Sequence, residues 1–324
     1  MILKDNVILV TGGTGSFGQK FTEIALQENS PKAIRIFSRG ELLQQEMRRR
    51  FNNDERLRFF IGDVRDRDRM HRAMSGVDIV VHAAALKQVP TCEYNPIEAV
   101  RTNIDGAANI IDAAIDSKVA QVISVSTDKA VQPINLYGAT KLVAEKLFIQ
   151  GNAYTGGRNP RFSCVRYGNV VGSRGSVIPL FLKQKKDGTI TITDERMTRF
   201  WITLEQGVRF VIDCIGRMHG GEIFVPKLPS MKVIDLADVV APRTKRKIIG
   251  IRPGEKVNEI LITEEEAIHA QEFSDYFVIE PEFSFWKGSN LHGGKALPTP
   301  FSYTSDNNNQ WLTKKELIPM IEEP

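Results

Sequence analysis

The side chains best suited to proton and hydride transfer lie in one short stretch of the chain: Asp128, Lys129, Tyr137 and Lys141. Residues at i and i+4 of a helix share one face, so we expect Tyr137 and Lys141 to lie side by side. A phenol has an ordinary pKa of about 10, and a neighbouring ammonium favours the phenolate. Tyr137 is therefore a candidate to accept the proton of a substrate hydroxyl during oxidation. Because helices also carry this spacing by chance, the interpretation depends on the surrounding sequence.

Alternating strands and helices are expected to position these residues. Apolar runs rich in β-branched residues predict strands at 7–10, 33–37, 58–61, 79–82 and 121–125. The segments between them have helical composition, which predicts an α/β fold with a Rossmann-type, doubly wound parallel sheet. Residues 1–167 are expected to form this domain, with a later segment at about 195–245 returning to it. Residues 168–324, where short strands alternate with loops rich in Gly and Pro, are expected to form mainly a smaller α/β substrate lobe.

A glycine-rich turn follows the first predicted strand. Glycine lets the backbone approach a pyrophosphate closely, and a helix N-terminus supplies amide donors and a favourable dipole. The turn is preceded by a strand and followed by a helical pattern, which is the context that supports dinucleotide binding. The predicted cofactor-binding residues of this turn are Gly12, Thr14, Gly15, Ser16, Phe17 and Gly18.

The second predicted strand ends in Ser38 and Arg39, where NAD-binding sites place a carboxylate on the ribose 2′-hydroxyl. A guanidinium at this place suits a 2′-phosphate, so the sequence predicts NADP as the cofactor. A surface arginine at a strand end is the alternative.

The ends of the next two predicted strands add further cofactor-binding candidates. Asp63 and Val64 follow the third strand and are expected near the adenine amino group. The fourth strand ends in His82, which we interpret as a packed core residue. After it come three small residues that leave room for the adenosine ribose and phosphates, or that reflect tight packing: Ala83, Ala84 and Ala85.

Length and composition limit the classes of function. The 324 residues suffice for one large core or a domain and a half, and a formal charge of +4 gives little support for nucleic-acid binding. The three cysteines, Cys92, Cys164 and Cys214, have no spacing typical of a metal site or a disulfide framework, which favours a reducing compartment. The chain begins without a charged-then-apolar leader and has no run long enough to span a membrane. We therefore expect a cytoplasmic protein without a metal or a membrane partner.

Longer runs make the chain similar to a known family. The glycine turn, the alanine run and the Tyr137/Lys141 pair resemble the extended short-chain dehydrogenases/reductases, which act mainly on nucleotide sugars. The runs at 84–90, 124–130, 166–179, 197–201 and 250–256 resemble the inverting UDP-N-acetylglucosamine 4,6-dehydratases, which open the pseudaminic acid pathway in bacteria. This resemblance extends from about Asp5 to the region 303–312.

A dehydration of this kind needs a redox pair, an acid and a base. Oxidation of carbon 4 of a hexose acidifies the carbon 5 proton, which permits loss of the carbon 6 hydroxyl. Tyr137, aided by Lys141, would serve the oxidation. Asp128 would protonate the departing hydroxyl, and Lys129 would remove the carbon 5 proton, provided that Lys141 and the nicotinamide lower the pKa of Lys129. Thr127 completes the predicted catalytic set.

The Asp128–Lys129 dipeptide separates this pattern from that of the retaining sugar dehydratases, which place a glutamate after the aspartate. The resemblance therefore implies inversion at carbon 5 and a 6-deoxy-4-keto product of the L-arabino configuration. A mutual surface ion pair at a strand end is the alternative interpretation of the two residues.

The resemblance also implies a binding site for UDP-N-acetylglucosamine. Asn169 and Arg199 would hold the diphosphate, and Arg252 and Glu255 would engage the diphosphate and the uridine ribose. The alternative for Glu255 is a carboxylate at a helix start. The predicted substrate-binding residues are Lys87, Asn169, Val177, Pro179, Thr191 (along the uracil), Arg199, Arg252 and Glu255, and Asn103 and Tyr167 complete the cofactor set.

The resemblance also implies an oligomeric state, and two other functions fit parts of the sequence pattern. In the family, the helix after the catalytic tyrosine often packs against its mate in another subunit, so we expect a homo-oligomer. An NADP-dependent epimerase would need Tyr137 and Lys141 but not Asp128 and Lys129. A non-catalytic nucleotide-sensing protein would keep only the cofactor site. The Asp128–Lys129 pair favours the dehydratase over the epimerase, and the intact Tyr/Lys pair argues against the sensor.

Overall fold

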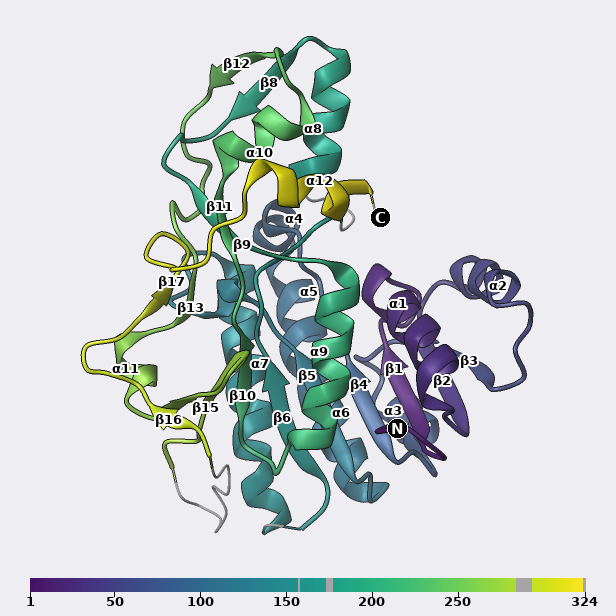
Figure 1. The fold of residues 1–324 in the computed structure, drawn as a ribbon. Coiled ribbons are helices and arrows are strands. Elements are labelled where there is room, and N and C mark those ends of the chain that lie inside the picture. The colour runs from purple at the N-terminus through teal and green to yellow at the C-terminus, as the bar shows by residue number, and fades with distance from the viewer. Residues whose placement is uncertain (157, 173–176, 284–292, 323–324) are drawn as a thin grey trace.

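A ten-stranded sheet forms the centre of the computed structural model, which describes residues 1–156, 158–172, 177–283 and 293–322 (Figure 1). Residues 173–176 of the run at 166–179 lie outside the described residues. The sheet order is β16-β14-β15-β10-β6-β5-β4-β1-β2-β3, and β3 through β10 are parallel. The strands are β1 (Val7–Thr11), β2 (Ala33–Ser38), β3 (Leu57–Ile61), β4 (Ile79–His82), β5 (Gln121–Val125), β6 (Arg161–Val165), β10 (Ile223–Pro226), β14 (Ala270–Glu272), β15 (Tyr276–Ile279) and β16 (Lys295–Ala296). The order 3-2-1-4-5-6 is that of the Rossmann fold, and the five predicted strands are confirmed.

Helices cover both faces of this sheet. α1 and α9 pack together on one face, while α3, α6 and α7 pack on the other (Figure 1). The helices of this layer are α1 (Ser16–Ile24), α2 (Glu41–Arg50), α3 (Arg67–Met74), α4 (Val89–Tyr94), α5 (Pro96–Val100), α6 (Gly106–Asp116), α7 (Leu136–Thr155) and α9 (Leu204–Arg217). Short π-helical turns join two of them to their neighbours, at Ala25–Asn29 and Arg101–Asp105, and a 3₁₀ turn lies at Asp128–Ala130.

A smaller lobe lies beyond the carboxyl ends of the parallel strands, at the top of Figure 1. Its elements are β7 (Asn169–Val170), α8 (Val177–Lys186), β8 (Thr189–Ile192), β9 (Thr198–Ile202), β11 (Ser230–Lys232), α10 (Val233–Val240), β12 (Lys245–Ile248) and α12 (Lys314–Glu322). β13 (Ile260–Ile262), α11 (Glu264–Ala267) and β17 (Tyr303–Thr304) lie beside the large sheet, and their buried residues Leu261, Ile262, Ala267 and Tyr303 belong to its core. Of the segment 195–245, α9 and β10 join the large sheet, whereas β9, β11 and α10 belong to the lobe.

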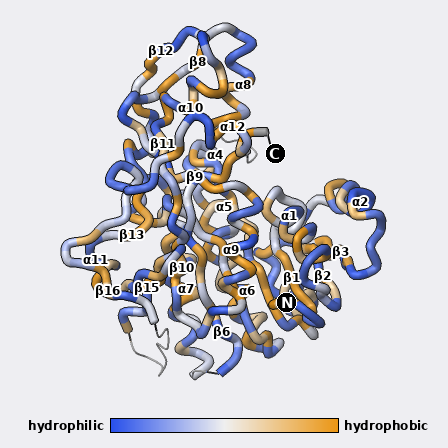
Figure 2. Tube along the Cα trace, viewed as in Figure 1, coloured by the Kyte–Doolittle hydropathy of each residue, from blue (hydrophilic) through white to orange (hydrophobic). Residues whose placement is uncertain are grey.

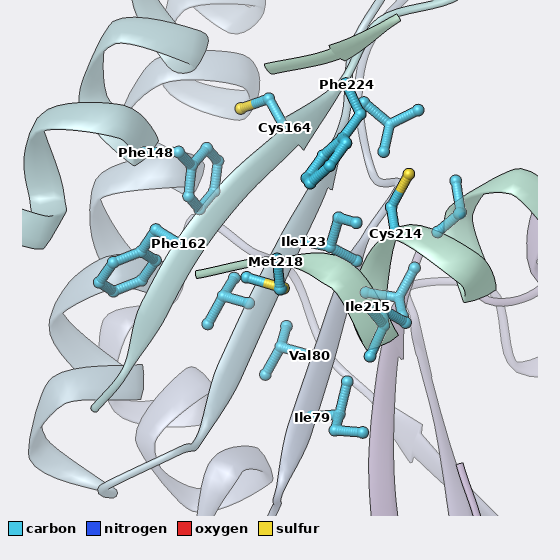
Figure 3. Packing of buried hydrophobic residues seen from close by; sticks show 14 of the residues in the cluster. Ile79, Val80, Ile123, Phe148, Phe162, Cys164, Cys214, Ile215, Met218 and Phe224 are labelled. Carbon is cyan, nitrogen blue, oxygen red and sulfur yellow. The ribbon is translucent and has the colours of Figure 1, made fainter. Parts of the chain in front are cut away.

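Each part has its own apolar core. The main core lies along the sheet, and hydrophobic stretches of the trace run through its strands and the helices that cover it (Figure 2). Figure 3 shows Phe148 of α7 and Phe162 of β6 on one side of this layer and Ile215 and Met218, at the end of α9, on the other. Truncating a buried phenylalanine such as Phe148 to alanine typically costs about 3–5 kcal/mol.

A buried ion network around Arg166 joins α7 to β13 and α11. Arg166 follows β6 and is 1% exposed, and its guanidinium donates to both oxygens of Glu145 on α7. It also donates to both oxygens of Glu266 on α11 and to the carbonyl of Leu261 on β13. A buried arginine is tolerated when its donors are met in this way. Within the described ranges, no helix is both long enough and apolar enough to cross a bilayer.

Candidate active site

A large cleft of about 1330 Å³ lies outside the carboxyl ends of the parallel strands, between the sheet and the lobe. In open α/β sheets, ligands bind in the crevice at this edge. The lining combines the glycine turn, the ends of β2 to β5, the start of α7 and, from the lobe, α8, β8 and the loop 252–256. The catalytic and binding candidates of both halves therefore face one shared space.

The glycine turn is shaped for close backbone approach. Gly12 has φ +67°, and a Cβ on it would lie about 3 Å from the backbone of Ala83 and Ala84. A Cβ on Gly18 would lie 2.4 Å from the carbonyl oxygen of Gly13. α1 begins at Ser16, and its N-cap, Gly15, makes no side-chain capping bond, which leaves the first amides of the helix directed at the cleft. The structure thus contains a cradle that fits a pyrophosphate.

Arg39 lies at the adenosine end of this cradle. It is exposed, follows β2 and lines the cleft beside Ser38 and Asp63. The Asp63 carboxylate accepts two hydrogen bonds from the Arg65 guanidinium, at 2.7 and 3.0 Å. Burial opposes ionisation of Asp63, but Arg65 and the more distant Arg39 outweigh it and lower its pKa. The Arg39 side chain has no ion-pair partner among the described residues, so it is available to a ligand phosphate.

The alanine run is fixed from behind by Asn103. This side chain, 1% exposed, donates to the carbonyl of Leu86 at 2.9 Å and to Thr140 at 2.9 Å. It also accepts from the amide of Leu86 at 2.8 Å. Asn103 therefore holds the 83–86 segment against α7 and lies behind the cleft surface.

Tyr137 and Lys141 lie on the first turns of α7, and both line the cleft. The Lys141 ammonium donates to the carbonyl of Val125 at 2.8 Å, and burial lowers its pKa. Burial raises the pKa of Tyr137 to about 12, against the opposing effects of Lys129 and a hydrogen bond with Thr127. In this structure the phenol is therefore held neutral, and a phenolate needs further positive charge nearby.

Asp128 and Lys129 form an ion pair inside the cleft. The Lys129 Nζ lies 3.0 Å from Asp128 Oδ1 and 3.3 Å from Glu259 Oε1, and the Asp128 side chain is only 1% exposed. Thr127 also donates to Asp128 Oδ1, at 2.8 Å. The alternative interpretation as a surface ion pair is wrong, because the aspartate is buried and the pair faces the cleft.

The charges around Lys129 give it a pKa opposite to the one predicted. Burial works against the ammonium, but the carboxylates of Asp128 and Glu259 outweigh this and raise the pKa of Lys129. The prediction that Lys141 lowers it is wrong for this structure, where Arg199 is the cation that opposes the ammonium. Burial, with Glu259, raises the pKa of Asp128, which suits a proton donor.

The nucleotide-sugar end of the cleft is built by the lobe. Arg252 and Glu255 face each other at 3.7 Å across a turn in which the Glu255 amide donates to the Arg252 carbonyl. Glu255 does not begin a helix, so that alternative is wrong. On β8, Thr191 lines the cleft and accepts a hydrogen bond from Gln184 at 2.8 Å.

Arg199 is engaged by the protein itself. Its guanidinium donates to the carbonyls of Thr198, Lys256 and Val257, at 2.7 to 2.9 Å, and its Nε lies 3.6 Å from Glu259. Arg199 therefore anchors the loop that follows Arg252. Binding a diphosphate, as predicted from the resemblance, would require it to exchange some of these partners.

The structure brings nearly all the predicted site residues into this one cleft. Those that line it are Gly12, Thr14, Gly15, Ser16, Phe17, Ser38, Arg39, Asp63, Val64, Ala83, Ala84, Ala85, Lys87, Thr127, Asp128, Lys129, Tyr137, Lys141, Tyr167, Asn169, Val177, Pro179, Thr191, Arg199, Arg252 and Glu255. Gly18 and Asn103 support the lining from behind. His82, 2% exposed and bonded to Thr11 at 2.8 Å, is confirmed as a core residue.

Several residues of the cleft were missed from the sequence. Glu259, Lys256 and Asn135 line it beside the catalytic candidates. Glu259 and Asn135 lie in none of the runs that resemble the family, and Lys256 ends the run 250–256 without a predicted role. The signal that identifies such residues is a buried polar atom without a hydrogen-bond partner. Buried side-chain atoms that lack a hydrogen-bond partner within the described residues include, in this cleft, Ser126 Oγ, Asp128 Oδ2, Asn169 Oδ1, Glu255 Oε2 and Glu259 Oε2. Such atoms are costly unless a ligand or water meets them.

Comparison with known proteins agrees with the fold and the cleft. A family model described as "Polysaccharide biosynthesis protein" matches residues 8–281. The chain belongs to this family of extended short-chain dehydrogenases/reductases. The chain is 51% identical, over 97% of its length and 96% of the relative's, to a UDP-N-acetylglucosamine 4,6-dehydratase (inverting) of Campylobacter jejuni. It is 46% identical, over 94% and 92% of the two chains, to a UDP-glucose 4-epimerase of Rickettsia canadensis.

Solved structures extend the comparison. The chain matches Pen from Bacillus thuringiensis with a TM-score of 0.91 and 41% identity, covering 99% of this family member and 98% of Pen. It matches DesIV, a dTDP-glucose 4,6-dehydratase from Streptomyces venezuelae, with a TM-score of 0.70 over 78% and 86% of the two chains. At 22% identity, the second match shows the fold alone.

Proposed function

We propose that this protein is an NADP-dependent UDP-N-acetylglucosamine 4,6-dehydratase that inverts carbon 5. The observation that carries the proposal is the buried Asp128–Lys129 pair, which lies in the same cleft as Tyr137 and Lys141. This arrangement supplies an acid and a base in addition to a redox pair. The 51% identity to an inverting dehydratase over nearly the whole chain supports the same assignment.

The cofactor end of the cleft fits a dinucleotide phosphate. The glycine cradle and the uncapped start of α1 suit a pyrophosphate, and Arg39 suits a 2′-phosphate. When bound, NADP supplies the acceptor for the carbon 4 hydride and its later donor to carbon 6, and its positive ring favours a phenolate. The small side chains of the 83–85 run leave the space that the ribose requires.

Tyr137 removes the proton from the carbon 4 hydroxyl as the carbon 4 hydride departs. Its high pKa in this structure reflects burial, so the reaction depends on added positive charge at the site. Lys141, fixed by the Val125 carbonyl, orients one cation on the same face of α7. Thr127, which bonds with the phenol and donates to Asp128, links the redox pair to the acid.

Lys129 and Asp128 then carry out the elimination. The Lys129 amine takes the carbon 5 proton, the electron pair forms the carbon 5–carbon 6 double bond, and Asp128 protonates the carbon 6 hydroxyl, which leaves as water. The pair holds one proton in this structure, as carboxylate and ammonium 3.0 Å apart. Transfer of that proton within the pair gives the neutral acid and neutral amine that the elimination needs, without exchange with solvent.

Completion of the cycle returns hydride to carbon 6 and a proton to carbon 5 on the opposite face. The product is UDP-2-acetamido-2,6-dideoxy-β-L-arabino-hexos-4-ulose. The lobe binds the substrate, since Asn169, Thr191, Arg252 and Glu255 line the cleft. Asn169 and Glu255 each have a buried polar atom without a hydrogen-bond partner among the described residues. Arg252, about half exposed, is the arginine with freedom to bind a diphosphate.

The cellular role follows from this chemistry. We propose that the product feeds pseudaminic acid synthesis for surface glycans or flagellin, as the first step of that pathway. The three cysteines are free and buried, which supports a reducing, cytoplasmic setting. Exposed apolar side chains on α4, α5 and α7 support a homo-oligomer.

A UDP-sugar 4-epimerase is the second candidate, because the Rickettsia relatives carry that name at 46% identity. An epimerase uses the redox pair and requires neither an acid for carbon 6 nor a base for carbon 5. The buried Asp128–Lys129 pair is unexplained by that reaction, which is why the dehydratase is preferred.

A proton NMR time course with UDP-N-acetylglucosamine in heavy water, with added NADP, distinguishes the dehydratase from the epimerase. A dehydratase that inverts carbon 5 gives a new carbon 6 methyl signal, deuterium at carbon 5 and the ring couplings of an L-arabino sugar. The same methyl signal with an unchanged carbon 5 configuration would contradict inversion. A change at carbon 4 alone would favour the epimerase, and an inert sugar would contradict both.

A further inference from the structure

Glu259 is a buried carboxylate in the catalytic cleft for which the reaction described above has no use. Its side chain is 2% exposed, and its Oε1 lies 3.3 Å from Lys129 Nζ and 3.6 Å from Arg199 Nε. Its Oε2 lies 4.0 Å from Lys256 Nζ and has no hydrogen-bond partner within the described residues. A buried carboxylate is costly unless cations meet it, and here three cations converge on one.

The backbone holds this carboxylate in place. The Glu259 amide donates to Ser305 Oγ at 2.9 Å, and the Ser305 amide donates to the Glu259 carbonyl at 2.9 Å. Ser305 is fully buried and is also bonded to Thr198, beside Arg199 on β9. The carboxylate position is therefore fixed by the segments next to β9, β13 and β17, whereas Lys129 comes from the 3₁₀ turn after β5.

We infer that Glu259 is a positioning residue, which holds the Lys129 amine between its own carboxylate and that of Asp128 at the place where carbon 5 is deprotonated. The inference rests on the proposed function for its meaning in the reaction. Lys129 has a long, flexible side chain, and Asp128 alone, as its sequence neighbour, restrains only one side of it. A second carboxylate, from the segment that precedes β13, fixes the other side of the Lys129 side chain.

The charge of Glu259 also sets the titration of the pair. The charged groups that face Glu259 are Lys129 from the 3₁₀ turn, Arg199 from β9 and Lys256 from its own loop, with Asp128 next beyond Lys129. These cations lower the pKa of Glu259 despite its burial, so it stays ionised. In return it raises the pKa of both Lys129 and Asp128. Removing the charge of Glu259 is therefore expected to lower the pKa of both Lys129 and Asp128.

The test compares Glu259→Gln, which removes the charge, with Glu259→Asp, which keeps the charge on a shorter side chain. In the pH profile of kcat, both limbs of the Glu259→Gln variant are expected to move to lower pH. The rate of deuterium entry at carbon 5 is expected to fall roughly 10- to 100-fold, with KM little changed, because a misplaced base slows the chemical step. Glu259→Asp is expected to restore the pH profile and part of the rate.

Glu222→Gln is the matched control for loss of a buried carboxylate. Glu222 is 3% exposed, accepts hydrogen bonds from Ser163 and from the amides of His219 and Gly220, and does not line the cleft. It is expected to lower the thermal stability without moving the pH profile. If Glu259→Gln likewise changes stability and leaves both limbs in place, Glu259 is only structural and the inference is overturned.

A measurement on the protein without ligands separates this inference from the proposed function. Neutral amines react with acetic anhydride, so the acetylation rate of Lys129 against pH, read by peptide mass spectrometry, reports its neutral fraction. Each unit by which the pKa falls raises that fraction about tenfold. Faster Lys129 acetylation in Glu259→Gln, with Lys87 as the cleft-lining comparison, supports the inference even if no 6-deoxy sugar forms. An unchanged Lys129 rate overturns it.

Discussion

At the scale of single residues, the decisive chemistry is carried by two neighbours of opposite charge. The Lys129 ammonium donates a hydrogen bond to the Asp128 carboxylate at 3.0 Å. Moving one proton along this bond gives the neutral acid and the neutral amine that an elimination requires. A resting ion pair is therefore compatible with a reaction that proceeds through its neutral form, at a rate set by how often that form is populated. Burial of Asp128 helps, because it raises the pKa of the acid.

The Lys129→Ala variant tests the role of Lys129 as the base. The variant is expected to bind NADP and UDP-N-acetylglucosamine and to give no 6-deoxy product, because nothing else takes the carbon 5 proton. Calorimetry measures the binding, and the NMR time course measures the methyl signal. Lys32→Ala, an exposed lysine outside the cleft, is the control and should turn over normally. A methyl signal at the wild-type rate from Lys129→Ala would remove the assigned role.

Arg39→Ala tests the cofactor choice. Loss of a charge-assisted hydrogen bond to a 2′-phosphate removes about 1.5–3 kcal/mol, so the Kd for NADP should rise roughly tenfold or more. The Kd for NAD should change little, since NAD has no such phosphate. Arg49→Ala, on the exposed part of α2 outside the cleft, controls for a general loss of positive charge. Equal losses for both dinucleotides would show that Arg39 does not read the phosphate.

At the scale of elements, Asn135 couples the catalytic helix to the substrate loop. Its Oδ1 caps α7 by accepting from the Gly138 amide at 2.8 Å, and its Nδ2 donates to the Gly254 carbonyl at 2.8 Å. Gly254 has φ +76°, and a Cβ there would lie 3.0 Å from Asn135 Cβ. The helix that carries Tyr137 and the loop that carries Arg252 and Glu255 are thus joined by one side chain.

Two substitutions separate these functions of Asn135. Asn135→Ala loses both bonds, so it should cost about 1 kcal/mol of stability and raise the KM for the sugar nucleotide several-fold. Asn135→Asp keeps an acceptor for the cap and loses the donor to the loop. It should recover the stability in a denaturant titration and keep the raised KM. If Asn135→Asp also recovers the KM, the bond to Gly254 does not position the loop.

The sequence predicted the helices and strands far better than the contacts between residues that are far apart in the chain. The strands from 7 to 125 followed from apolar runs rich in β-branched residues. β1, β4 and β5 are mostly buried, whereas β3 at the edge of the sheet is partly exposed. Glu259 was not predicted, because it meets Lys129 only through a fold that brings together residues 130 positions apart, and its own neighbours carry no chemical pattern. The opposite pKa shift of Lys129 has the same origin. Local spacing identifies reactive side chains, and tertiary packing sets their charges.

At the scale of the whole molecule, several apolar side chains lack cover in the single chain. Tyr94 on α4, Ile97 on α5 and Val143 on α7 are 88%, 60% and 41% exposed, and these three helices pack against one another. Ile149, farther along α7, is buried in the core. Exposed apolar groups gathered on neighbouring elements favour association.

Sedimentation velocity should therefore show a dimer or a larger assembly. Ile97→Glu combined with Val143→Glu should shift the protein toward the monomer, because charges in an apolar interface are costly. Leu42→Glu, on the distant α2 and 68% exposed, should leave the assembly unchanged. A monomer at all concentrations in the unmodified protein would contradict the expected homo-oligomer.

The global stability should fall in acid because of His82. Burial, with a smaller effect of Lys141, lowers the pKa of His82 to about 3, against about 6.5 when unfolded. Its contribution is fully present above pH 6.5 and is lost as the pH falls toward 3, since only the unfolded state then binds the proton. Between about pH 7 and about pH 5, the free energy of unfolding of the wild type, measured by denaturant titration, should fall by roughly 2 kcal/mol more than that of His82→Gln, which keeps a polar partner for Thr11.

His71→Gln is the contrasting control. A hydrogen bond to the Arg67 carbonyl and one to Asp116 raise the pKa of His71, so the small contribution of His71 to stability is lost as the pH rises. Equal acid sensitivity of the wild type and His82→Gln would show that other groups govern the transition.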